Sequence, residues 1–172
     1  MKLNQGFIAE LKHEAASTRK MLEHVPMDKG DFKPHEKSMT LARLAVHVAE
    51  LPGWVGFTMG SDELDLAKMD YKPATPTTNA ELVAVLDKNI ETAIAALENC
   101  TDEDFGKMWS LRRGENVVFS MPKAAVVRSF AMSHLYHHRG QLSVYLRMLD
   151  AYVPGMYGPS KNDSEMMQAA AN

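Results

Sequence analysis

The fold follows from residues 122–150, which read PKAAVVRSFAMSHLYHHRGQLSVYLRMLD. Pro122 suits the first turn of a helix, because a proline there loses no hydrogen bond that the helix needs. One face of the stretch is marked by residues three or four positions apart, which is helical spacing: Val127, Phe130, His134, His138, Gln141 and Tyr145. We therefore predict a long helix that runs to about Asp150 and carries two histidines on its buried face.

Three more helices are expected before this one. Residues 4–24 and 81–100 show helical apolar spacing, and Thr78 or Asn79 is a plausible N-cap for the second of them. A further apolar stripe follows Thr40 and reaches Val55, although the Pro52-Gly53 pair should kink or end its regular part. These patterns predict an all-α protein built as an antiparallel four-helix bundle.

The segments between these helices are less regular. Residues 107–122, KMWSLRRGENVVFSMP, place apolar residues on both sides of an Arg-Gly-Glu-Asn turn, which indicates a short hairpin or an extended crossover before the last long helix. Residues 25–39 mix two prolines with Gly30 and charged residues, which predicts a linker, and residues 59–77 are polar, with two prolines near Thr75. The tail from residue 153 is rich in glycine and proline and then in alanine and methionine, so we expect a loop followed by a short helix.

Composition limits the class of protein. The chain has 172 residues, 45% of them hydrophobic, and we expect one domain over residues 1–172. Cys100 is the single cysteine, which excludes an intrachain disulfide. The net charge is −3 and no basic stretch stands out, so nucleic-acid binding is not expected. No apolar run reaches the roughly 20 residues of a membrane span, and no signal peptide is visible, so a cytoplasmic protein without a membrane partner is expected.

The histidines carry the strongest chemical signal. His134 and His138 are four residues apart, so their side chains differ by only about 40° around the helix and can reach one ion. His47 lies on the apolar stripe of another helix, between Leu44 and Leu51. A single histidine on such a face is more often a hydrogen-bonded core residue than a ligand. Three together predict a divalent metal site with a coordination position open for water or a small-molecule substrate.

Several neighbouring residues are candidates for supporting roles. His137 lies near the same face and is the competing ligand to His138. Glu50 and Gln141 are candidates for orienting an imidazole or a bound water, although each can equally be a polar residue at the edge of a helix face. Imidazole ligands suit zinc, nickel or iron, so the sequence alone does not select the metal.

Three segments give the chain a resemblance to a known family: SMTLARLAVHVAELPGW (residues 38–54), HLYHHRGQLSVYLRMLD (134–150) and VPGMYGPSKNDSE (153–165). With these motifs the chain resembles the DinB/YfiT-like family of bacterial metal-binding proteins, over essentially its whole length. The resemblance implies a four-helix bundle, commonly a homodimer, with one divalent metal held by three histidines that correspond to His47, His134 and His138. Some relatives are transferases or isomerases that depend on bacillithiol, mycothiol or glutathione.

This resemblance favours a metal-dependent transferase that activates a low-molecular-weight thiol toward small electrophiles. Two alternatives remain: a non-catalytic metal-binding stress-response protein, and a metal-dependent hydrolase that activates water. An open coordination position distinguishes both enzymes from the stress-response protein. A cationic pocket beside the metal, for which Arg139 and Arg112 are the candidate residues, would favour the thiol over water.

Overall fold

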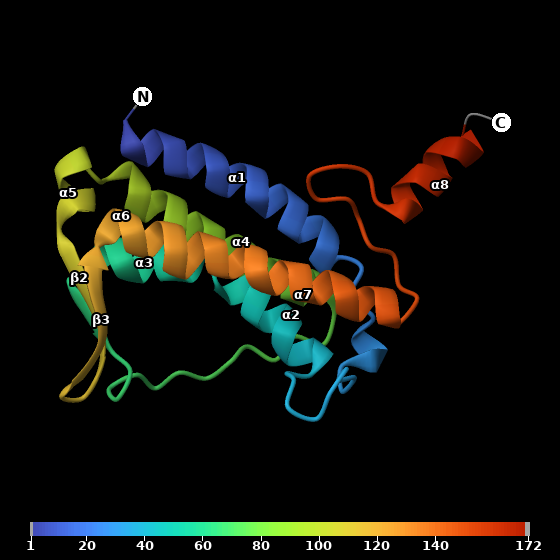
Figure 1. Cartoon of the computed structure of the whole chain (residues 1–172), viewed down its shortest axis with the longest axis horizontal. Coiled ribbons are helices and arrows are strands. Elements are labelled where there is room, and N and C mark those ends of the chain that lie inside the picture. Colours follow the sequence, from blue (N-terminus) through green and yellow to red (C-terminus); the bar gives the residue numbers. More distant parts are fainter. Residues whose placement is uncertain (1, 171–172) are drawn as a thin grey trace.

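The computed structural model describes residues 2–170 and shows a mainly helical protein (Figure 1). Its long helices lie side by side as a bundle, as the sequence predicts, and the last is one continuous rod of three parts. The helices of the bundle are α1 (Leu3–Leu22), α2 (Leu41–Glu50) with α3 (Gly53–Gly60), α4 (Asn79–Glu98), and α6 (Lys123–Val126) with η2 (Val127–Ser133) and α7 (His134–Met148). Short helices also occur at η1 (Met27–Lys29), α5 (Asp102–Gly106) and α8 (Lys161–Ala170).

The second rod bends at Pro52, as predicted, because proline has no N–H for the helical ladder. Asn89 of α4 reaches this bend, where its amide donates to the carbonyl of Ala49 at 3.3 Å. Gly53 allows the close approach, since a Cβ at this position would lie 2.5 Å from the side-chain oxygen of Asn89. The bend therefore packs closely against α4. At the start of α4, Thr78 is the N-cap and accepts the N–H of Glu81.

A small sheet covers one end of the bundle (Figure 1). Strands β2 (Met108–Arg113) and β3 (Asn116–Pro122) form the predicted antiparallel hairpin, whose turn has Gly114 at φ 57°. A third strand, β1 (Glu63–Asp65), pairs in parallel with β2 and gives the order β1-β2-β3. This strand lies in the polar segment of residues 59–77, for which the sequence predicts no regular element. Trp109 is fully buried beneath the sheet, and β3 leads directly into α6.

Leucine is the most frequent residue in the core, and all four rods contribute leucines to it. Fully buried examples are Leu11, Leu22, Leu41, Leu44, Leu82, Leu86, Leu97, Leu142 and Leu146. Helix α8 lies apart from the bundle in Figure 1 and has no buried residue, consistent with the short helix expected in the tail. Across residues 2–170, none of the helices combines the length and the apolar character needed to cross a bilayer.

One ion pair lies inside the bundle. Arg139 of α7 is 2% exposed and Glu14 of α1 is 5% exposed, and their side chains meet at 2.6 Å. Arg139 also donates to the hydroxyl of Thr18 at 3.0 Å and to that of Tyr157 at 2.7 Å. Its guanidinium thus links α7 to α1 and to the tail. The expectation that Arg139 supplies a cation to a substrate pocket is wrong, because the guanidinium is buried and its hydrogen bonds go to side chains of α1 and the tail.

We predict that Arg139→Met lowers the free energy of unfolding by about 3–5 kcal/mol, because it leaves the Glu14 carboxylate buried without its cation. The double variant Glu14→Gln/Arg139→Met should lose less, since no charge is then left unpaired. The control is Arg19→Gln, which breaks an exposed ion pair with Asp87 and should lose less than about 1 kcal/mol. Urea unfolding followed by circular dichroism measures all three variants. Equal losses for Arg139→Met and Arg19→Gln would show that the buried pair does not stabilise the bundle.

Candidate metal centre

Three histidines from two helices converge inside the bundle. His47 comes from α2, and His134 and His138 come from successive turns of α7. The Nε2 atoms of His134 and His138 are 2.9 Å apart, and those of His47 and His134 are 3.4 Å apart. One nitrogen from each ring lies within 4.8 Å of the other two. The structure thus brings together the three histidines that the sequence singles out, and we call them the histidine cluster.

A wide helical turn immediately precedes the cluster. Residues of η2 form a π-helix, and the hydroxyl of Ser133 donates to the carbonyl of Arg128 five positions earlier, at 3.0 Å. Such turns contain one more residue than an α-turn and are frequent at functional sites. Phe130 in this turn packs edge-on against Trp54, with ring centroids 4.8 Å apart, and also lies beside the ring of His134. The cluster therefore has an aromatic wall on this side.

The hydrogen bonds of two rings fix the position of their protons. Nδ1 of His134 donates to the carbonyl of Phe130 at 3.3 Å, and Nδ1 of His138 donates to the side-chain oxygen of Gln141 at 2.7 Å. Both Nε2 atoms then carry lone pairs, because a neutral imidazole has one N–H only. Two lone pairs that face each other at 2.9 Å repel unless a cation lies between them. The donor set therefore fits a divalent metal ion.

The rings are also held in the uncharged form that binds metals. Burial lowers the pKa of His47 to about 4, and the neighbouring His138 and His134 add to this effect. Burial likewise lowers the pKa of His134 and that of His138, although the hydrogen bonds that they donate to Phe130 and Gln141 act in the opposite direction. All three rings are therefore neutral at neutral pH, so no proton has to leave before an ion binds.

The other candidate residues have different surroundings. Gln141 contacts His138, as expected of a residue that orients an imidazole. Glu50 contacts no imidazole, and instead accepts from the hydroxyl of Tyr71 at 2.5 Å and from the N–H of Ala74 at 3.2 Å. His137 is exposed, lies outside the cluster and only stacks edge-on against His138.

A hollow of about 580 Å³, which we call the larger hollow, opens beside His47. Its apolar part is formed by Trp54, Phe57, Leu66 and Met69, and its basic residues are Arg43, Lys72, Lys88 and Arg113. Glu50 and Tyr71 also line it. Arg112, the other cation suggested by the sequence, is instead paired with Glu63 at 3.3 Å and is not part of the lining. The larger hollow is thus lined by cations, but they are not the two arginines that the sequence suggested.

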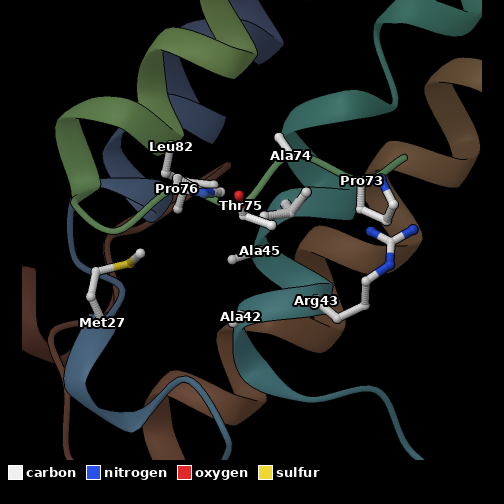
Figure 2. A pocket seen from close by; sticks show the side chains of 10 residues that line it. Met27, Ala42, Arg43, Ala45, Pro73, Ala74, Thr75, Pro76 and Leu82 are labelled. Carbon is white, nitrogen blue, oxygen red and sulfur yellow. The ribbon is translucent and has the colours of Figure 1, made fainter. Parts of the chain in front are cut away.

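A smaller hollow of about 310 Å³ lies on the other side of residues 73–76 (Figure 2). Figure 2 shows Met27, Ala42, Ala45 and Leu82 around it, and the guanidinium of Arg43 beyond Pro73. Arg43 and Ala74 line both hollows, so residues 73–76 form a thin wall between them. None of the lining residues found for this hollow in the described chain is a histidine. A further hollow of about 440 Å³ borders His138 and Gln141. The larger hollow, which borders His47 and is lined by aromatic and basic side chains, is the candidate substrate pocket.

Comparison with known proteins agrees with this arrangement. The uncharacterized protein YrdA of Bacillus subtilis is 26% identical over 157 residues, which cover 91% of this chain and 89% of the relative. A crystal structure of a DinB-like protein from Bacillus cereus matches with a TM-score of 0.68 and 25% identity, over 89% of this chain and 97% of the other. A DinB-like protein from Bacillus subtilis matches in fold, with a TM-score of 0.70 and 19% identity over 90% of this chain and 99% of the other. The model of the DinB family matches residues 1–170, and the chain therefore belongs to the DinB family.

Proposed function

We propose that this protein binds one divalent metal ion, zinc, nickel or iron, through Nε2 of His47, His134 and His138. We further propose that it uses this ion to activate a low-molecular-weight thiol toward a small electrophile. The observation that carries the proposal is the convergence of the three histidines beside an open hollow, with the Nδ1 protons of His134 and His138 directed away from the Nε2 atoms that face one another. Three protein ligands leave a position for an exchangeable group, as in catalytic metal sites.

A divalent ion at this place would lower the pKa of a coordinated thiol and so supply a thiolate at neutral pH. The protein's side chains would position the ligand ring and line the pocket. Gln141 holds the ring of His138, while Trp54 and Phe57 give the larger hollow an apolar lining. In the transfer the sulfur bonds to an electrophilic carbon, the leaving group departs with its electron pair, and the thiol proton passes to solvent.

The larger hollow favours a thiolate over the two alternatives. Its lining contains four basic residues and one acidic residue, which suits an anion. A hydrolase would need a general base near the bound water, and the only carboxylate in the lining, that of Glu50, is already occupied by Tyr71 and Ala74. A purely structural metal site would be closed by a fourth protein ligand, whereas the three-histidine cluster borders an open hollow.

We predict that His138→Ala lowers metal affinity by more than about a hundredfold, since loss of an outer hydrogen-bond partner alone weakens metal sites by about 10–100-fold. The matched control is His137→Ala, which removes an exposed ring one position away and should change affinity less than about twofold. Elemental analysis of untagged protein and competition with a chelator give the stoichiometry and affinity. If both variants lose metal equally, the assignment of ligands is wrong.

We predict that the metal-loaded protein catalyses the reaction of bacillithiol, mycothiol or glutathione with chlorodinitrobenzene. His47→Ala should reduce the rate to that of the metal-free protein, because the thiol would no longer meet a bound ion. His137→Ala should retain the rate of the unaltered protein. Rates that do not depend on metal, or that survive in His47→Ala, would exclude metal-activated thiol transfer.

We also propose a homodimer. Two large apolar side chains on the outer face of α7 support it, because Val144 is 56% exposed and Met148 is 54% exposed. Light scattering at micromolar concentration should give twice the 19.2 kDa mass of one chain. Val144→Glu should shift the mass toward the monomer, while Val117→Glu, at an equally exposed position on β3, should not. A 19.2 kDa species for the unaltered protein would contradict the dimer.

A further inference from the structure

We propose that the thiol taken by the larger hollow carries a carboxylate, which Lys88 and Arg113 bind, with an apolar segment between the thiol and the carboxylate. This inference rests on the proposed function, because it specifies the substrate class of the same site. It makes Lys88 and Arg113 specificity-determining residues. The observations that support it are the distribution of free and paired charges around the hollow, the elements that carry them, and the apolar side chains that line the same hollow.

The basic residues of the hollow differ in whether they have acidic partners. Arg43 pairs with Glu50 at 3.5 Å and donates to the hydroxyl of Tyr71 at 3.1 Å. Lys72 pairs with Asp70 at 3.2 Å. Among residues 2–170, Lys88 and Arg113 have no ion pair and no side-chain hydrogen bond. Two cations around the hollow therefore remain available to an anion from outside the chain.

The two free cations come from different parts of the fold. Lys88 projects from α4 in the bundle, and Arg113 is the last residue of β2 in the sheet. Both residues are exposed, so their charged ends keep contact with water while their aliphatic stems line the hollow. The planar guanidinium of Arg113 can donate two parallel hydrogen bonds to a carboxylate, and the ammonium of Lys88 can add a third.

The same hollow also has a large apolar surface. Trp54, Phe57, Leu66 and Met69 line it alongside His47. A ligand that places its sulfur at the cluster would therefore lay an apolar segment against these side chains. The one carboxylate of the lining, Glu50, is paired with Arg43, so it does not cancel the two free cations. A thiol with a cationic end would meet like charge at Lys88 and Arg113.

The test uses two probes that differ only at the far end, mercaptohexanoate and mercaptohexanol. The protein is loaded with cobalt(II), and thiolate binding is followed by the near-ultraviolet charge-transfer absorption that a cobalt–sulfur bond produces. We expect mercaptohexanoate to bind about tenfold more tightly than mercaptohexanol at low salt, with the difference shrinking as ionic strength rises. The double variant Lys88→Gln/Arg113→Gln should bring mercaptohexanoate to the level of mercaptohexanol and leave mercaptohexanol within about twofold of its original affinity.

The control is Lys12→Gln/Lys33→Gln, which removes the same charge from exposed positions outside the hollow and should preserve the preference. An equal loss of preference in this control would show an effect of net charge and overturn the inference. An equal affinity of the unaltered protein for both probes would also overturn the inference, while thiol coordination itself would stand. Absence of the absorption band with either probe would overturn the proposed function and this inference with it.

Discussion

The buried ion pair of Arg139 and Glu14 sets the orientation of α7, and the histidine cluster depends on that orientation. Arg139 follows His138 directly, so their side chains leave the helix about 100° apart. With the guanidinium held by Glu14 on α1, the imidazoles of His134 and His138 face α2, from which His47 comes. A rotation of α7 that moved the histidines away from His47 would also move the guanidinium away from Glu14 and leave two buried charges unpaired. The ion pair therefore stabilises the rotation of α7 about its axis that keeps His134 and His138 facing His47.

The cluster combines features that favour an ion and an exchangeable ligand. Partial burial keeps the rings uncharged, and the bonds to Phe130 and Gln141 leave the Nε2 lone pairs without protons. The side that faces the larger hollow has no fourth histidine, cysteine or carboxylate within ligand distance among the described residues. The arrangement is pre-formed, because helices rather than loops carry all three rings.

The sequence predicts the parts of this structure that follow from periodicity. The helices, the kink and the hairpin came from apolar spacing and from proline and glycine, and spacing also placed His47 and His138 on buried faces. It does not predict the pairing of distant segments. Glu50 is a candidate for orienting an imidazole or a bound water, and local spacing does not show that its carboxylate accepts a hydrogen bond from Tyr71, in a polar segment 21 residues further on. Arg139 was expected in a pocket, because helical angle alone does not show that Glu14 lies opposite it.

The wide turn of η2 has a consequence for how this chain can change in evolution. The turn stores one extra residue between the hairpin and His134, without breaking the rod that carries the cluster. A chain that lacked one residue here would close the turn to an ordinary α-helix and keep the same histidine pair, four residues apart, facing α2. The hairpin and the start of the rod would shift instead. A change in chain length at η2 would thus shift the residues before it, which form the sheet at the end of the bundle, and would leave the imidazole nitrogens of His134 and His138 in place.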